Sequence, residues 1–228
     1  MKKLKNELKG LILVNKPSGI TSHDVVDFVR KRLGIKRVGH AGTLDPLAEG
    51  LLIILIGKYT KFFSKFACFD KEYLGVLKLG EITATGDSQG KILKKLSFSK
   101  LDDHKVRDVF SSFIGEIEQV PPMISAIRVK GKRLYKLARK GIVIARKPRK
   151  IKIYKLDILN IDMPLVEFYV RCSKGTYIRK LAEDIGGKLG CGAHIVKIKR
   201  LACGPFKLIE AINLENINEN HIKEIPPA

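Results

Sequence analysis

The chain has 228 residues, of which 45% are apolar, and its mean hydropathy is -0.02. This composition is that of an ordinary globular protein and argues against intrinsic disorder and a fibrous protein. The longest uninterrupted apolar run, residues 51–56, is far shorter than the roughly 18 residues that a membrane span needs. The lysine-rich N-terminus is followed by only a short apolar stretch, so we expect neither a membrane span nor a secretion signal.

Net charge is the most informative number, since 44 Lys and Arg residues against 23 Asp and Glu residues leave +21. A charge this far from neutral opposes compaction by self-repulsion, which favours an anionic partner. Nucleic acid is the first candidate. An anionic membrane surface is the second, but such binding usually needs an amphipathic basic helix or a lipidation signal, and the sequence shows no N-terminal Met-Gly and no C-terminal Cys box.

The cysteines give no sign of a disulfide framework or a zinc site. They form no Cys-x-x-Cys pair and do not lie near the histidines at zinc-ligand spacing. We therefore expect reduced, mostly buried thiols in a cytoplasmic protein. The four cysteines are Cys68, Cys172, Cys191 and Cys203.

The hydrophobic spacing predicts short strands and helices along the whole chain, with no repeat and no linker. The first half is predicted to contain a strand over residues 10–14, a helix that Ser22 caps and that ends at Gly34, a glycine-rich loop over 36–50, a strand over 51–56, a short helix over 59–66, a strand over 73–79 and a helix over 99–113. The second half is predicted to contain strands over 151–160 and 165–172, a helix over 177–189, and strands over 194–200 and 206–209.

These predicted strands come mostly in adjacent pairs without a helix between them. Such an order favours a mixed, mainly antiparallel sheet with helices packed outside it. The fold class predicted from the sequence is therefore α+β.

More than half of the net charge lies in one segment. Residues 119–156 contain thirteen Lys and Arg residues and no Asp or Glu. An ordinary solvated face mixes both signs, so we interpret this segment as a contact for a phosphate backbone. Within it, residues 131–141 are predicted to form a short helix between glycines. The candidate backbone contacts are Lys130, Lys132, Arg133, Lys136 and Arg139.

The loop over residues 39–50 is the first candidate for chemistry. Pro46 favours an extended backbone at Asp45, and Gly42 permits backbone shapes that other residues resist. An Asp-Pro pair in such a loop can also be a simple turn. The loop lacks the pattern of a phosphate-binding loop, and no cluster of carboxylates or histidines suggests a metal. A lone nucleophilic or general-base aspartate remains as the chemical interpretation.

A second candidate segment runs over residues 171–184. It enters a helix from a strand, and Arg179 lies in the first turn of that helix. The segment can be a routine strand-to-helix connection with Tyr177 in the core. Alternatively, Arg179 pairs with a buried carboxylate and keeps it ionised.

Taken together, six segments resemble the TruB family of tRNA pseudouridine synthases, which isomerise uridine 55 in the T loop of tRNA. They occur in the family's order and cover nearly the whole chain. The matching segments are residues 13–19, 39–50, 71–73, 115–135, 172–179, and 190–194 with 200–201. Residues 47–50 resemble the bacterial tRNA enzymes rather than the catalytic subunit of guide-RNA particles. The resemblance implies the pseudouridine synthase fold.

The resemblance also implies roles for single residues. Asp45 is implied to be the nucleophile that attacks the sugar or the base of a flipped uridine, so that the base detaches, rotates and rejoins through carbon. Arg179 is implied to pair with this aspartate, and Tyr73 to stack on the target base and take part in proton removal. The other implied site residues are His40, which helps to flip the nucleotide, Lys16, which braces the site, and Tyr177 and Leu201, which line the pocket wall.

The expected partner is the T stem-loop of tRNA, with no cofactor, no metal, no membrane and no obligate protein partner, and we expect a monomer. The basic insertion, about residues 117–150, is implied to close over the RNA loop. Because the chain stops soon after residues 206–213, we expect a single catalytic domain over 1–228 without a C-terminal PUA-type domain.

An alternative from another class is an RNA-binding or RNA-folding module in which Asp45 is only structural.

Overall fold

The computed structural model describes residues 8–99, 101–125, 128–129, 131–138 and 141–224. The chain divides into two compact units: unit 1 comprises Met1–Tyr73 and Ile198–Ala228, and unit 2 comprises Leu74–Lys197. Two strands, β4 (Lys71–Leu79) and β12 (Ala193–Cys203), carry the chain from one unit into the other. The expected single catalytic domain over residues 1–228 stays a prediction.

Unit 1 is built around the antiparallel pair of β1 (Gly10–Lys16) and β3 (Glu49–Ile56), which runs in register from Gly10 opposite Ile56 to Lys16 opposite Gly50. Strand β2 (Val38–Ala41) also pairs antiparallel with β3. The short strand β14 (Ile212–Asn213) is parallel to β1, and the last part of β12 is parallel to the start of β3. Strand β13 (Phe206–Lys207) folds back antiparallel on β12.

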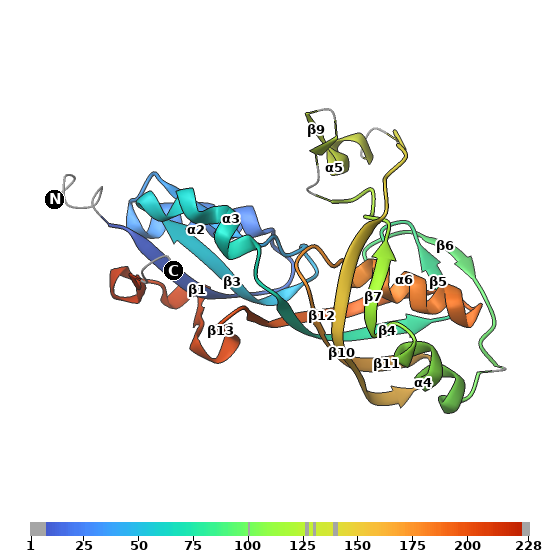
Figure 1. Cartoon of the computed structure of the whole chain (residues 1–228). Coiled ribbons are helices and arrows are strands. Elements are labelled where there is room, and N and C mark those ends of the chain that lie inside the picture. The colour runs from blue at the N-terminus through green and yellow to red at the C-terminus, as the bar shows by residue number, and fades with distance from the viewer. Residues whose placement is uncertain (1–7, 100, 126–127, 130, 139–140, 225–228) are drawn as a thin grey trace. The chain divides into compact units, whose positions relative to one another are not determined.

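The apolar core of unit 1 explains why β3 reads as one continuous hydrophobic run. From Gly50 to Ile56 every residue of β3 is buried, so both faces of the strand are covered. Three helical elements lie beside this part of the sheet (Figure 1). They are helix α2 (Ser22–Leu33), the 3-10 helix η1 (Gly57–Phe62) and helix α3 (Phe63–Ala67). One core cluster contains the residues Leu11, Leu13, Ala41, Leu51, Ile53, Leu55, Tyr59, Phe66, Cys203 and Phe206.

Unit 2 contains a second antiparallel group of strands. Strand β10 (Arg149–Asp162) lies between β7 (Gly115–Gln119) and β11 (Leu165–Cys172), and β4 is the next strand after β11. Helix α4 (Asp103–Ser111) packs against β10 and α6 (Ile178–Leu189), and the rings of Phe110 and Phe168 meet edge to face at 5.9 Å. Gly75 makes room for Phe168, since a Cβ there would lie 2.5 Å from the Phe168 ring.

Smaller elements complete the two units. In unit 2, β5 (Glu81–Thr83) and β6 (Ile92–Lys95) form a hairpin. The basic segment forms a second hairpin, β8 (Arg128–Val129) with β9 (Lys132–Arg133), followed by helix α5 (Leu134–Ala138). In unit 1, the C-terminal residues form the 3-10 turns η2 (Leu208–Glu210), η3 (Leu214–Asn216) and η4 (Glu219–His221).

The predicted α+β class and the mainly antiparallel sheet are confirmed, because five of the seven strand pairings given above for the two main groups of strands are antiparallel. Several details were wrong. The predicted loop over 36–50 contains β2, the predicted helix over 99–113 is shortened to α4, and the predicted strand over 206–209 ends as η2. Strands β5, β6 and β7 were not predicted.

The cap of α2 also differs from the prediction. Thr21, not Ser22, is the N-cap: its hydroxyl accepts a hydrogen bond from the Asp24 amide, and the Asp24 carboxylate accepts one from the Thr21 amide. This reciprocal pair satisfies two amides that a helix start leaves unbonded. Ser22 is thereby left to bond a different segment, the loop that carries Asp45.

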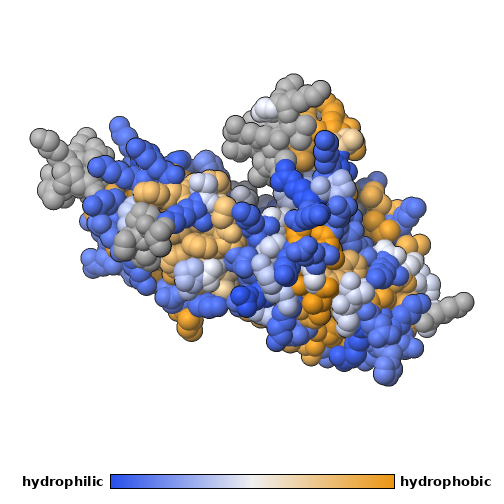
Figure 2. All heavy atoms as spheres, in the orientation of Figure 1, coloured by the Kyte–Doolittle hydropathy of each residue, from blue (hydrophilic) through white to orange (hydrophobic). Residues whose placement is uncertain are grey.

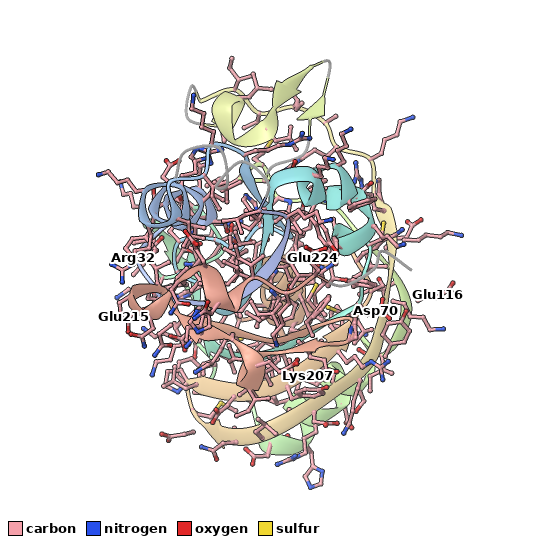
Figure 3. All side chains as sticks on the ribbon, turned by 90° about the vertical axis from the view of Figure 1, so that its left-hand side faces the viewer. Arg32, Asp70, Glu116, Lys207, Glu215 and Glu224 are labelled. Atoms are coloured by element: carbon pink, nitrogen blue, oxygen red, sulfur yellow. The ribbon has the colours of Figure 1, made fainter. Side chains whose placement is uncertain are left out.

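On the face shown in Figure 2, hydrophilic residues cover much of the surface, and hydrophobic patches lie among them. In unit 1, the charged side chains Arg32, Lys207 and Glu215 are exposed and lie on the outside of the ribbon (Figure 3). Cys172, Cys191 and Cys203 are buried and Cys68 is exposed, as expected for mostly buried thiols. Among the described residues, no helix is both long enough and apolar enough to span a bilayer.

Gly50 offers a direct test of the strand junction in unit 1. Its φ is +100°, and a Cβ there would lie 2.4 Å from the main-chain oxygen of Arg200. Gly19 has a similar φ of +92° but no heavy atom within 4 Å of a Cβ. We expect Gly19→Ala to lower the free energy of unfolding by about 1 kcal/mol through backbone strain, and Gly50→Ala to lower it by about 3 kcal/mol or more, because a steric clash adds to the strain.

Urea denaturation of the two variants and the wild type measures this difference. Equal destabilisation by the two substitutions would show that the contact between β3 and β12 at Arg200 is not tight.

Candidate active site

The loop that carries Asp45 connects β2 to β3 and is anchored on both sides of the aspartate. Before it, the Ser22 hydroxyl bonds Leu44 twice, donating to its carbonyl at 3.0 Å and accepting from its amide at 2.8 Å. After it, the Gly19 amide donates to the Pro46 carbonyl at 2.8 Å. Asp45 itself is half-buried, so its carboxylate is held on a rigid backbone without being sealed inside the core.

Further bonds fix the same loop from the segment that follows β1. The Ser18 hydroxyl donates to the Leu47 carbonyl at 2.9 Å, and the Ala48 amide donates to the Asp45 carbonyl at 3.0 Å, which closes a turn over Asp45. These hydrogen bonds therefore join two segments of unit 1, residues 16–22 and residues 42–48. This is more support than a simple Asp-Pro turn needs.

Lys16 supports the same two segments from the interior of unit 1. Its side chain is completely buried, and its ammonium group donates to the carbonyls of Pro17 at 2.8 Å, Ile20 at 2.7 Å and Pro46 at 3.3 Å. Burial lowers the pKa of Lys16 from 10.5 to about 8, and the negative charge of Asp45 opposes this shift. Lys16 thus lies close enough to Asp45 for the two charges to influence each other.

Three more predicted site residues belong to unit 1. His40 is half-buried on β2, opposite Ile54 of β3, two positions before Gly42. Tyr73 is 8% exposed on β4, and Leu201 is half-buried on β12. The structure therefore places five of the seven predicted catalytic and substrate-binding residues in the unit that holds Asp45.

The other two predicted residues, Tyr177 and Arg179, lie in unit 2 at the start of α6. Arg179 is 4% exposed, and its guanidinium donates to the carbonyls of Thr85 at 2.7 Å and Ile124 at 2.8 Å. It also lies 3.7 Å from the buried carboxylate of Asp87. The predicted pairing of Arg179 with a buried carboxylate is found at Asp87, and the implied pairing with Asp45 stays a prediction.

Tyr177 is the N-cap residue of α6 and is half-buried. The side chain of Gln119, which is 2% exposed, bonds both of its backbone groups: it accepts from the Tyr177 amide at 2.8 Å and donates to the Tyr177 carbonyl at 3.2 Å. A single buried amide thus fixes the point where β11 turns into α6.

Three of the five predicted RNA-backbone residues lie in the hairpin and helix of the basic segment. Lys130 and Arg139 lie outside the described residues. Lys132 and Arg133 form β9, and Lys136 lies in α5, but their side chains are outside the described part of the structure. The lysines and arginines that follow on β10, namely Arg149, Lys150, Lys152 and Lys155, are exposed.

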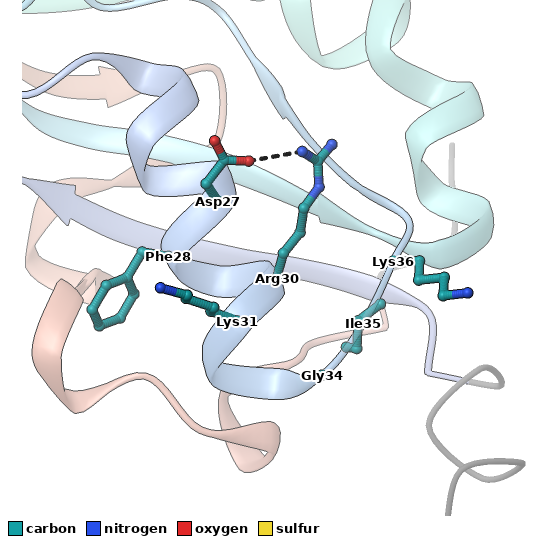
Figure 4. A pocket seen from close by; sticks show the side chains of 7 residues that line it. All are labelled: Asp27, Phe28, Arg30, Lys31, Gly34, Ile35 and Lys36. Atoms are coloured by element: carbon teal, nitrogen blue, oxygen red, sulfur yellow. Dashed lines mark hydrogen bonds and ion pairs between the residues drawn. The ribbon is translucent and has the colours of Figure 1, made fainter.

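Two pockets have linings that include none of the predicted catalytic and substrate-binding residues. One, of about 770 Å³, lies at the C-terminal end of α2, where Arg30 pairs with Asp27 at 2.8 Å and Phe28 and Lys31 line the wall (Figure 4). The other, of about 460 Å³, lies in unit 2 and includes Lys180, whose ammonium group is 2.7 Å from the Asp184 carboxylate. Among the described residues, no group of three or more His, Cys, Asp or Glu residues could hold a metal ion.

Comparison with known families decides what kind of protein carries this loop. Residues 30–178 match the model of the N-terminal domain of the TruB family pseudouridylate synthases, and residues 179–225 match that of the tRNA pseudouridylate synthase B C-terminal domain. The chain belongs to the TruB family. The resemblance predicted from the six sequence segments is thereby confirmed, and the chain is an RNA pseudouridine synthase.

Individual relatives agree with this assignment. The chain is 51% identical over 217 residues to a protein of Clostridium tetani named tRNA pseudouridine synthase B, covering 95% of this chain and 75% of the relative. A protein of the same name from Opitutus terrae is 44% identical over 221 residues, which covers 97% of this chain and 92% of that one.

Among solved structures, the chain is similar to one chain of a Cbf5-Nop10-Gar1 complex, with a TM-score of 0.73 and 31% identity. The match covers 94% of this chain but only 54% of that chain, so this protein spans about half its length. The predicted pseudouridine synthase fold is confirmed.

Several buried polar side chains were not predicted to hold distant parts of the chain together. Asp87 was missed in the sequence, Ser22 was predicted only as a helix cap, and Arg200 and Gln119 were noticed only as parts of matching segments. Ser22 and Asp87 lie among other polar residues in the sequence, so no local pattern marks them as buried. Their partners could not be found without the fold.

The lowered pKa of Lys16 predicts a change of stability with pH. Because the folded protein releases this proton near pH 8 and the unfolded chain near 10.5, the free energy of unfolding should rise between these two pH values. We expect the wild type to gain up to about 3 kcal/mol relative to Lys16→Met across this window. Urea denaturation of both proteins from pH 7 to 10.5 measures the gain, and parallel pH curves would contradict the assigned pKa.

Proposed function

We propose that this TruB-family enzyme converts uridine 55 in the T loop of tRNA into pseudouridine, with Asp45 as the nucleophile. The observation that carries the proposal is the half-buried carboxylate of Asp45 on a loop that is braced immediately before and after it. The relatives that are 51% and 44% identical to this chain over the aligned residues are named tRNA pseudouridine synthase B, which supports tRNA as the substrate.

The proposed chemistry needs one carboxylate and no added reactant. Breaking the bond between the uracil nitrogen and the ribose builds positive charge on the sugar, which a nearby carboxylate stabilises or traps. Alternatively, the carboxylate adds to the ring of the base. The base then turns and rejoins the ribose through its C5, which loses its proton while the ring nitrogen gains one. No atom is gained or lost overall, so the reaction is an isomerisation.

The target uridine must leave its stack to meet Asp45, which costs a few kcal/mol. In the proposal, Tyr73 offsets part of this cost by stacking on the base, a contact worth about 1 to 3 kcal/mol. Tyr73 also takes part in removing the C5 proton. His40 assists the flipping, Tyr177 and Leu201 line the pocket, Lys16 braces it, and Arg179 pairs with Asp45.

The proposed partner is the T stem-loop, held by the basic segment over about residues 117–150. The net charge of +21 supports such a contact, because counterion release from the phosphate backbone then favours binding. The backbone contacts in this proposal are Lys130, Lys132, Arg133, Lys136 and Arg139. We further propose that the enzyme acts in the cytoplasm as a monomer, without an obligate protein partner.

The nucleophile is tested with a tRNA transcript that carries tritium at C5 of uridine. The wild type should release tritium, and Asp45→Asn should slow the release by at least about 1,000-fold while tRNA binding is retained, because an amide cannot act as the nucleophile. Asp27→Asn is the matched control, since it makes the same change at an exposed position of unit 1. Turnover by Asp45→Asn at the wild-type rate would remove Asp45 from the mechanism.

The basic segment is tested by changing Lys132, Arg133, Lys136 and Arg139 together to glutamine. If these residues contact phosphates, the slope of log Kd for tRNA against log salt should fall by up to about 3 to 4 units, and affinity should drop at low salt. The control changes an equal number of exposed lysines on β6 and α4 and the loop before β6, namely Lys91, Lys94, Lys95 and Lys105. Equal slopes for the two variants would show that the effect is one of net charge alone.

A further inference from the structure

Among its described residues, unit 1 buries three cationic side chains that donate hydrogen bonds to main-chain carbonyls. Lys16 is 0% exposed, Arg200 is 1% exposed and Lys71 is 7% exposed. Removing such groups from water is costly, and they are rarely buried without a structural or functional reason. Lys71 donates to the carbonyls of Ala67 and Phe69, just ahead of β4. The other two, Lys16 and Arg200, both reach the loop that carries Asp45.

Arg200 reaches this loop from β12. It lies opposite Gly50, where β12 and β3 run parallel. Its Nε donates to the carbonyl of Leu51 at 2.7 Å, and its Nη2 donates to the carbonyl of Gly42 at 2.9 Å. One planar group therefore joins the start of β3 to the start of the loop, three residues before Asp45.

Lys16 holds the other side of the loop, where its ammonium group donates to the carbonyl of Pro46 directly after Asp45. The aspartate thus lies between two carbonyls, those of Gly42 and Pro46, and each is bound by a buried cation from a different strand. Neither cation needs to touch the substrate to affect the position of the carboxylate.

We propose that Arg200 is a positioning residue for the isomerisation: it fixes the backbone of the Asp45 loop through the Gly42 carbonyl and places a positive charge beside Lys16. The inference rests on the proposed function of Asp45 as the nucleophile.

The geometry requires arginine rather than lysine. The guanidinium presents Nε and Nη2 in a fixed plane, so it donates to two carbonyls in defined directions, whereas an ammonium group on a flexible stem does not reproduce this fork. Gly42 suits this position because of its backbone: its φ is +78°, a conformation that favours glycine, whereas a Cβ there would make only an ordinary contact of 3.4 Å with Nη1 of Arg200.

The charge of Arg200 has an effect of its own, because the carbonyls of Gly42 and Leu51 do not neutralise it. It lowers the pKa of Lys16 further, after burial as the main cause, while Asp45, Asp24 and Glu49 raise it. These are the charged groups that face Lys16. Removing the charge of Arg200 should therefore raise the pKa of Lys16, an effect that the loss of a purely structural contact would not produce.

Two substitutions separate geometry from charge. Arg200→Lys keeps the charge but loses the fork, and Arg200→Met loses both. In single-turnover assays of tritium release, we expect both to be slower than the wild type by about 10- to 100-fold, because a small misplacement of a catalytic group has an effect of this size. The affinity for tRNA should stay within about twofold, since Arg200 is buried and its bonds go to the protein's own backbone.

The second measurement is the pKa of Lys16, followed by NMR of the lysine Cε in 13C-labelled protein, with Lys16→Arg to assign the signal. This pKa should rise above about 8 in Arg200→Met and stay near it in Arg200→Lys. The control is Lys61→Met, which removes an exposed cation from η1 in the same unit and should change neither the rate nor the pKa.

Wild-type rates in Arg200→Lys and Arg200→Met would overturn the inference, and so would a slower Arg200→Met in which the pKa of Lys16 does not move. If Arg200→Met does not fold, the rate of Arg200→Lys and its affinity for tRNA decide whether the fork is needed. A wild-type enzyme that releases no tritium would contradict the proposed function instead, and the pKa of Lys16 would still report on Arg200.

Discussion

The structure of unit 1 depends on the anchoring of one loop by buried polar groups. Asp45 lies in a connection between two strands, which is ordinarily the most mobile part of a fold. Here the hydroxyl of Ser22 and the ammonium group of Lys16 bind the main chain on either side of it. A loop without such anchors would let its backbone move, whereas this backbone is hydrogen-bonded directly before and after Asp45. Such preorganisation is what the proposed role of Asp45 as the nucleophile requires.

The choice of main-chain carbonyls as acceptors has an electrostatic consequence. A buried lysine or arginine paired with a carboxylate forms a neutral unit, but Lys16 and Arg200 donate to uncharged oxygens and keep their positive charge. Burial disfavours that charge, and the pKa of Lys16 falls to about 8 as a result. The negative charge of Asp45 acts on Lys16 in the opposite direction and raises its pKa. The same two side chains therefore bind the backbone of the loop and keep positive charge beside it.

The sequence predicted the parts of the structure that depend on local pattern. The apolar run of β3 and the helical spacing of α2 and α6 were evident, and the six matching segments, including the one around Asp45, identified the family. The sequence could not predict which polar groups form hydrogen bonds with each other. Thr21 and Ser22 are adjacent and equally able to cap α2, and only the fold shows that Ser22 is needed by Leu44, 22 residues away. Short strands such as β2 escaped notice because glycine and histidine weaken their pattern.

The predicted site residues are held in place by different contacts, and these contacts differ in how easily they can be predicted from the sequence. The anchors of the Asp45 loop belong to unit 1, and Arg179 is held in unit 2 by Thr85, Asp87 and Ile124. Tyr73 and Leu201 instead lie on β4 and β12, the strands along which the chain passes between the units. A loop motif is compact in sequence and can be read directly. A contact such as that of Arg179 with Asp87 joins residues 92 positions apart and requires the three-dimensional structure.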